Sequence, residues 1–169
     1  MSPRQPLPRL WLMTDERLGD ALLPTVERLP TDAGIVFRHH SLEPGARRTL
    51  FGRVREAAAG RLLLLAGPAA DWGAYGSHGR GPATGLRTAP AHDLAEIRAA
   101  EDAGAALIFL SPVFETRSHP GATTLGPAGF GALAGQTKLP VVALGGMNAQ
   151  RFKALENAYG WAAIDAWTA

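Results

Sequence analysis

The sequence predicts an α/β fold of the (β/α)8, or TIM, barrel class, and three observations lead to this prediction. Short apolar runs without alternation, typical of strands buried on both faces of a parallel sheet, recur along the chain. Segments with helical spacing separate these runs, and counting two weaker runs gives eight strands. The first run is not followed by the G-x-G-x-x-G turn of dinucleotide-binding open sheets, which disfavours that alternative.

The length of the chain limits how complete such a barrel is. Its 169 residues fall below the lower bound of about 200 residues for this fold. The segment 67–91 is rich in glycine and proline and carries little helical pattern. We therefore expect a short, partly trimmed barrel with reduced helices in the 67–91 region and no final outer helix.

Each expected strand is a short apolar run that ends at a turn or polar residue. From the amino end the strands are 10–13, 35–40, 62–66, 74–75, 85–87, 106–110, 139–144 and 161–164, the fourth and fifth being the weak ones.

The expected helices are recognised by their ends. They span 17–29, 46–59, 94–103, 127–135 and 149–159. Asp93 and Glu96 form a pair like the capping box, and Asn148 is a favourable N-cap residue. The buried side of the second helix is expected to carry Leu50, Val54 and Ala57.

The composition excludes several classes of protein. A chain of this length that is 46% hydrophobic is expected to form one domain, 1–169, with residues 1–9 flexible. No apolar run reaches the roughly 20 residues of a membrane helix and no secretory signal is visible, so we expect a cytoplasmic protein. Scattered arginines and a net charge of +2 argue against a nucleic acid as the partner. Whether the chain forms a homo-oligomer stays open.

The turn after the seventh expected strand is a candidate phosphate site. Gly145 and Gly146 follow the apolar run, and Asn148 begins the next helix. Glycines let a ligand approach the main chain, and the amino end of a helix favours anions. The alternative is a tight turn that needs small residues only for packing.

Several stretches of this chain resemble the thiamine phosphate synthase family and its sister group, the thiazole tautomerases. The most specific is Pro112-Val113-Phe114-Glu115-Thr116, which follows Gly104-Ala105 and a strand. The stretches 10–15, 92–96, 140–147 and 163–164 occur in the order and at the spacing of the family. The resemblance covers most of the chain and is best from 92 to 165.

The resemblance implies a barrel enzyme of thiamine biosynthesis with its site at the carboxyl ends of the strands. The family reaction joins a phosphorylated thiazole to a pyrimidine carried as its diphosphate and releases diphosphate. We therefore expect a transferase, a thiamine-phosphate diphosphorylase, with small phosphorylated molecules as its partners. The Gly145–Gly146 turn would hold the thiazole phosphate.

The diphosphate-binding residues of the family are matched only in part. In the second strand the family pattern Gln-x-Arg-x-Lys becomes Val36, Arg38 and His40. Strand alternation places these three side chains on one face, by analogy the barrel interior. Arg38 could hold the diphosphate bidentately. The histidines at positions 39 and 78 are expected to be structural, either solvated or hydrogen-bonded.

The loop after the specific motif would supply further phosphate contacts. Thr116 is retained, whereas the family lysine that meets the diphosphate is replaced by His119, with Arg117 close by. The alternative for Thr116 is a turn cap. Asp165 ends the last strand, where a carboxylate would repel a phosphate.

The acidic residues depart most from the family. The resemblance implies Mg²⁺ held by aspartates after the third and fourth strands. Here Asp71 is the only carboxylate between Ala57 and His92, so it is the one candidate metal ligand.

Two other functions stay open at this point. A thiazole tautomerase needs a general acid–base and no metal, and His92 matches the histidine that transfers the proton in that branch. A degenerate barrel that binds a phosphate ligand without turnover is the third hypothesis, because the chain is short and several polar residues are replaced.

Overall fold

Eight parallel strands close into a barrel, in the order in which they occur along the chain. The computed structural model describes residues 6–68 and 70–168. The first and last strands close the ring through the parallel pairing of Trp11 with Ala162. This confirms the predicted fold class. The strands are β1 (Leu10–Met13), β2 (Gly34–Phe37), β3 (Leu62–Ala66), β4 (Gly76–His78), β5 (Leu86–Ala91), β6 (Leu107–Leu110), β7 (Val141–Leu144) and β8 (Gly160–Ala163).

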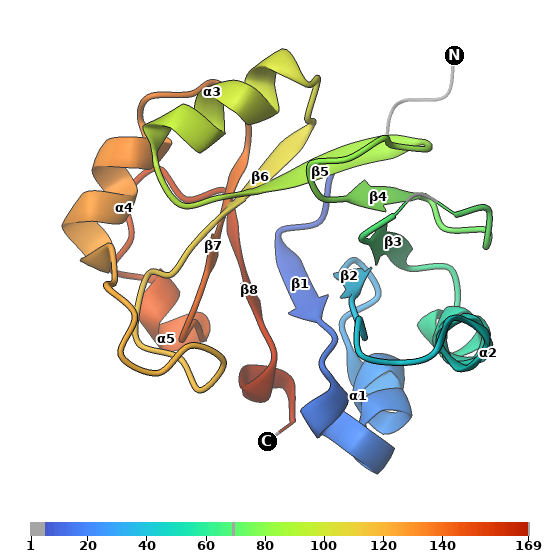
Figure 1. Ribbon diagram of the computed structural model, residues 1–169. Coiled ribbons are helices and arrows are strands. Elements are labelled where there is room, and N and C mark those ends of the chain that lie inside the picture. The colour runs from blue at the N-terminus through green and yellow to red at the C-terminus, as the bar shows by residue number, and fades with distance from the viewer. Residues whose placement is uncertain (1–5, 69, 169) are drawn as a thin grey trace.

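The helices lie outside the ring, with α1 and α2 on one side and α3 and α4 on the other (Figure 1). Asp93 caps α3 by accepting a hydrogen bond from the amide of Glu96, and Asn148 caps α5 through the amide of Arg151, as predicted. None of these helices in the described residues is long and apolar enough to cross a membrane. The helices are α1 (Leu22–Arg28), α2 (Pro44–Ala58), α3 (Leu94–Asp102), α4 (Gly126–Ala134) and α5 (Ala149–Phe152), with 3-10 turns η1 (Glu16–Ala21) and η2 (Asp165–Trp167).

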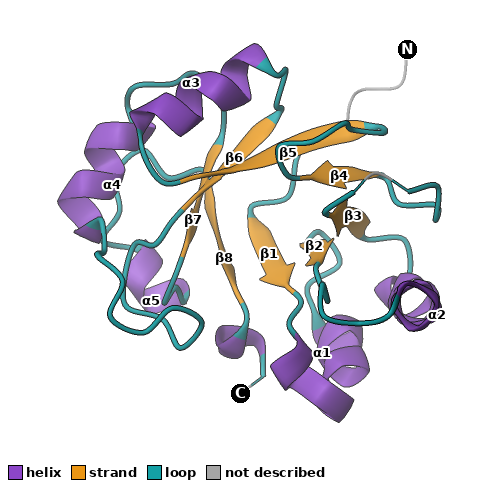
Figure 2. Ribbon diagram, viewed as in Figure 1, coloured by secondary structure: helices purple, strands orange, loops and turns teal. Residues whose placement is uncertain are grey.

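The trimming of the barrel falls where the glycine-rich segment predicts it. In the described parts of 67–75 and 79–85, which link β3 to β4 and β4 to β5, the chain forms loops and no helix (Figure 2). Within the described residues, β8 is followed by the short η2. The two weak strands are real but shifted, since β4 is 76–78 instead of 74–75 and β5 continues from 86 to 91.

Four local predictions are corrected by the structure. The second strand ends at Phe37 and not at residue 40, because His39 adopts a left-handed φ of 40° and turns the chain. The helix expected over 17–29 is broken at Gly19, whose φ is 47°. The helix expected over 149–159 ends at Phe152, and the helical conformation is not resumed at Asn157, which is left-handed and donates its side-chain amide to the carbonyl of Gly131. The buried side of α2 is formed by Arg47, Phe51, Val54 and Ala58.

The barrel interior is filled by side chains of alternate strand positions. The rings of Trp11 and Phe109, from β1 and β6, meet edge to face at 5.2 Å. Gly34 faces the same interior, paired in register with Trp11. A Cβ at position 34 would collide with the Trp11 ring, so the indole fills space that a side chain on β2 would otherwise occupy.

A histidine also lies in the interior, near the carboxyl ends of the strands. His78 on β4 is buried, contacts the Thr88 hydroxyl through Nδ1 at 3.0 Å, and meets the Phe109 ring edge to face at 5.1 Å. Burial, followed by the charges of Arg38 and His40, lowers the pKa of His78 to about 4. The structural, hydrogen-bonded role expected for His78 is therefore what the fold provides.

Replacing Gly34 by alanine is expected to lower the free energy of unfolding by about 1–3 kcal/mol, because it overpacks the barrel against Trp11. Gly52 is the matched control, since it lies inside α2 with nothing within 4 Å of an added Cβ. Gly52→Ala is expected to stabilise by about 0.5–1 kcal/mol through helix propensity. Urea titration of both variants measures the difference, and equal effects would contradict this packing of the interior.

The free energy of unfolding is also expected to decrease as the pH is lowered, because of His78. The unfolded histidine takes up a proton near its ordinary pKa of 6.5, whereas the folded one does so only near about 4. Between those values the unfolded state binds more protons, so the free energy of unfolding drops as the pH falls, by about 3 kcal/mol over the window. Urea titrations of the wild type and His78→Gln across this window test the effect. The variant should lose markedly less stability on acidification, and parallel curves would refute the assignment to His78.

Candidate functional site

The predicted site residues follow the carboxyl ends of four strands and therefore share one rim of the barrel. Arg38 and His40 come after β2, and His92 after β5. The loop 113–125 and the Gly145–Gly146 turn follow β6 and β7. In parallel barrels this rim is where ligands bind. Asp71 does not join them, as described below.

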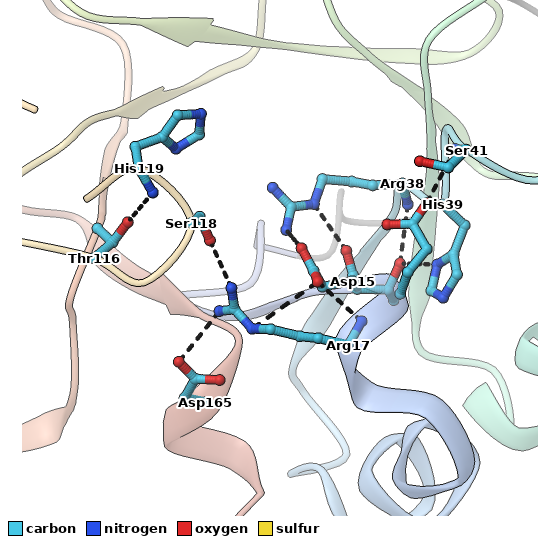
Figure 3. Close-up of polar contacts among 11 residues, drawn as sticks. Asp15, Arg17, Arg38, His39, Ser41, Thr116, Ser118, His119 and Asp165 are labelled. Atoms are coloured by element: carbon cyan, nitrogen blue, oxygen red, sulfur yellow. Dashed lines mark hydrogen bonds and ion pairs between the residues drawn. The ribbon is translucent and has the colours of Figure 1, made fainter.

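The guanidinium of Arg38 is fixed along one edge (Figure 3). Its Nε donates to the carbonyl of Thr14 at 2.8 Å, and its Nη2 contacts the Asp15 carboxylate at 3.1 Å. The backbone amide of Arg38 donates to the Thr14 hydroxyl at 2.9 Å. Among the described residues the structure gives no partner for Nη1 of Arg38. The arrangement thus holds the cation in place while leaving donors for an anion.

The turn at His39 gives Arg38 its direction. His39 is buried, its ring stacks on Phe37 at 4.9 Å, and its Nδ1 lies 3.0 Å from the Thr14 hydroxyl. Burial lowers the pKa of His39, with the nearby carboxylates of Glu16 and Asp15 opposing that effect. A non-glycine residue in the left-handed region is strained, and such strain persists only where packing and hydrogen bonds hold it.

Arg47 on α2 joins the ends of β2 and β3. It is buried, and its Nη2 donates to the carbonyls of Arg38 at 2.7 Å and Ala66 at 2.6 Å. Its guanidinium lies over the rings of Phe37 and Trp72 at 5.6 and 5.4 Å. Sequence reasoning missed this residue. The available signal was its position four residues before Phe51, on the side of α2 that the structure buries.

His40 lies at the same rim, although it does not continue the strand. An added Cβ on Gly67, just after β3, would lie 3.3 Å from its ring. Burial comes first and the charges of Arg47 and Arg38 second in lowering the pKa of His40. A lowered pKa disfavours the charged form of the His40 ring, so the positive charge near it is that of Arg38 and Arg47.

Arg17 ties the loop after β6 to the rim. Its Nη1 donates to the Ser118 hydroxyl at 2.9 Å, and its Nη2 contacts the Asp165 carboxylate at 3.2 Å (Figure 3). The negative charge at position 165, which would repel a phosphate, is thus paired with a cation. In the same loop the amide of His119 donates to the Thr116 hydroxyl at 3.1 Å, so Thr116 caps a turn.

The side chains of Arg117 and His119 are exposed on this loop. The His119 ring does not join the contacts around Asp15 (Figure 3). The loop therefore reaches the rim through Ser118, while its two basic side chains stay available to a ligand.

The glycine turn after β7 packs directly against the specific motif. Gly145 and Gly146 have φ values of 102° and 59°, and added Cβ atoms would collide with the Pro112–Glu115 backbone. The amide of Phe114 donates to the carbonyl of Gly145 at 3.1 Å. Packing thus explains why both positions are glycine. With only four residues, α5 adds little dipole to this corner.

A cation that the sequence reasoning missed lies at this corner. Arg151 of α5 donates from Nη1 to the carbonyl of Gly146 at 2.5 Å, and its guanidinium lies 4.7 Å from the centre of the Phe114 ring. Its signal was only its place three residues after the Asn148 cap. The positive charge at the glycine turn therefore comes from a side chain.

His92 is held by the first turn of α3. Its Nδ1 lies 2.7 Å from the Glu96 carboxylate, which also accepts the His92 amide at 2.8 Å and contacts Arg80. The imidazole is exposed. The capping pair predicted from Asp93 and Glu96 therefore has a second role in orienting His92.

The candidate metal ligand Asp71 does not lie with the other predicted site residues. Asp71 lies on the outer side of the barrel, in a recess against α2 that Arg48 and Arg55 also line. No group of three or more histidine, aspartate or glutamate side chains within 6–68 and 70–168 is arranged to hold a metal ion. The Asp15 and Asp165 carboxylates at the rim are engaged by arginines. The candidate metal ligand Asp71 thus does not join the expected magnesium site, because residues 71–73 lie against α2.

Comparison with known proteins agrees with the resemblance seen in the sequence. Residues 88–166 match the family model described as thiamine monophosphate synthase. The match runs from within β5 to the end of β8 and therefore includes His92, the specific motif and the glycine turn.

One curated relative extends this comparison. The Aquifex aeolicus protein named "Putative thiamine-phosphate synthase 2" is 40% identical over 76 residues, which is 44% of this chain. The chain matches 41% of the length of that relative.

Solved structures support the fold over nearly the whole chain. Thiamine phosphate pyrophosphorylase from Pyrococcus furiosus aligns with a TM-score of 0.72 and 22% identity, covering 95% of this chain and 88% of that one. FabK from Thermotoga maritima aligns with a TM-score of 0.67 and 11% identity. The alignment covers 95% of this chain and 59% of the FabK chain. Both therefore show the same barrel architecture.

Proposed function

We propose that the chain is a thiamine-phosphate synthase-like transferase, a proposal supported by the match of residues 88–166 to the thiamine monophosphate synthase family model. Its substrates would be a phosphorylated thiazole and a pyrimidine diphosphate, and its products thiamine phosphate and diphosphate. The observation that carries this proposal is Arg38, whose guanidinium is held at the rim along one edge by Thr14 and Asp15. A leaving diphosphate requires such a fixed cation.

The proposed reaction is a displacement at the pyrimidine methylene carbon. The thiazole nitrogen forms the new bond to that carbon with its lone pair, while the bond from carbon to the diphosphate oxygen breaks and its electron pair leaves with the diphosphate. Negative charge therefore grows on the leaving group. Arg38 faces that charge with preorganised donors, which stabilise a transition state more than flexible groups in water do. His40 adds a hydrogen bond from its neutral ring.

The thiazole phosphate is assigned to the corner formed by Gly145 and Gly146. Arg151 places positive charge there, and the neighbouring segment carries the Thr116 hydroxyl. The exposed Arg117 and His119 on the same loop would meet the diphosphate end of the second substrate. Two phosphate-binding groups would then hold the nitrogen and the methylene carbon close to each other, which lowers the entropic part of the barrier.

A purified-protein assay with both phosphorylated substrates tests the proposal. Diphosphate release that requires both substrates, with thiamine phosphate as the other product, supports it. Thiazole isomerisation without diphosphate release, or ligand binding without either reaction, contradicts it. Parallel reactions with Mg²⁺ and with a chelator show whether the ion accompanies the diphosphate.

Replacing Arg38 by alanine is expected to lower kcat by about 10²–10³-fold, as for other fixed donors that face transition-state charge. Arg38→Lys should retain part of the rate, since it keeps the charge and loses the planar fork. Arg53→Ala on the exposed side of α2 is the matched control and should keep wild-type kinetics. An Arg38→Ala variant with unchanged kcat and KM would remove Arg38 from the site.

A further inference from the structure

We propose that Asp15 is a positioning residue that sets the direction of the Arg38 guanidinium at the phosphate-binding rim. Asp15 follows β1 and lies outside the region matched by the family model. The identity of the anion rests on the function proposed above. The role of Asp15 toward Arg38 rests on the contacts of these two residues alone.

The Asp15 carboxylate lies between two guanidinium groups. One oxygen contacts Nη2 of Arg38 at 3.1 Å. The other accepts the backbone amide of Arg17 at 3.1 Å and lies 3.9 Å from its Nε. The side chains of Asp15 and Arg38 are only 23% and 24% exposed, so the pair is shielded from solvent. Such a geometry restricts the carboxylate and, through it, the cation.

The two contacts of Arg38 lie on the same edge of its guanidinium. Thr14 receives Nε and Asp15 receives Nη2, which together block rotation of the planar group. Without Asp15, a single hydrogen bond to a carbonyl would remain on that edge. Nη1, on the remaining side, is the part left for a ligand.

Charge and orientation predict opposite results for the loss of Asp15. A carboxylate beside a phosphate site repels the phosphate, so simple attraction would make binding tighter once the charge is removed. However, burial lowers the pKa of Arg38 and Asp15 counters this, while Arg17 adds repulsion. Removing the carboxylate leaves two like charges at one place in a shielded site, and the Arg38 side chain would turn toward solvent.

The direct test is the binding of inorganic diphosphate to the wild type and to Asp15→Asn by titration calorimetry. Asparagine keeps an oxygen for the Arg17 amide, removes the charge, and replaces the oxygen that faces Nη2 of Arg38 by an NH2 donor. We expect Kd to rise at least about tenfold despite the lost repulsion. Equal or tighter binding would overturn the proposal. Asp20→Asn in the same η1 segment is exposed and controls for net charge.

A double-mutant cycle separates positioning from a general structural effect. In an Arg38→Ala background, Asp15→Asn should leave diphosphate binding unchanged or slightly tighter, because there is no Arg38 guanidinium for Asp15 to orient. A further tenfold loss in that background would show that Asp15 acts elsewhere and would refute its role through Arg38. Thermal unfolding of each variant reports any loss of fold.

The NMR signal of the Arg38 Nε–H group, which donates to the Thr14 carbonyl on the same edge, reports the order of the guanidinium without any ligand. In the wild type this proton should exchange slowly and show the relaxation of an ordered side chain, and in Asp15→Asn it should become mobile. An equally ordered Arg38 in the variant would overturn the proposal. A wild type that binds no diphosphate would overturn the proposed function and the anion-binding part of this inference, while the NMR signal still decides whether Asp15 fixes Arg38.

Discussion

The pairing of β1 with β8 is the constraint on which the rest of the molecule depends. Parallel strands have no free edge once the ring is closed, and here closure is reached with strands of three to six residues. Closure is possible because glycine occupies a position where a side chain would collide with the interior, as at Gly34 beside the Trp11 ring. Closure also creates the site, because Asp165 after β8 meets Arg17 after β1, although 148 residues separate them.

The architecture could be predicted because its signals are local. Unbroken apolar runs gave the strands, and side-chain caps such as Asp93 and Asn148 gave helix starts. The errors arose where a distant contact decides the local backbone. His39 leaves the strand conformation because its ring is held by Phe37 and Thr14. The neighbouring residues in the sequence do not predict that turn. In the same way α5 ends early where Asn157 is drawn to the carbonyl of Gly131.

The location of the site could be predicted from the sequence, whereas the contacts among its residues could not. Residues at strand ends must gather at one rim, so Arg38, His92 and the glycine turn could be anticipated. Which groups pair there depends on the register between strands and on side-chain reach, so the partners Asp15 and Arg151 were missed. Asp71 shows the converse error. It is near a strand end in the sequence, yet the loop that carries it folds back along α2.

The loop between β3 and β4 has a consequence for how a barrel can shrink. In place of a covering helix it offers Trp72, whose ring shields the guanidinium of Arg47, while Arg55 of α2 donates to the carbonyl of the same residue. The neighbouring helix α2 thereby covers this part of the barrel, and the charged side chain of Arg47 forms part of the barrel wall. A barrel can therefore do without a helix between two strands where the adjacent helix covers the connecting loop.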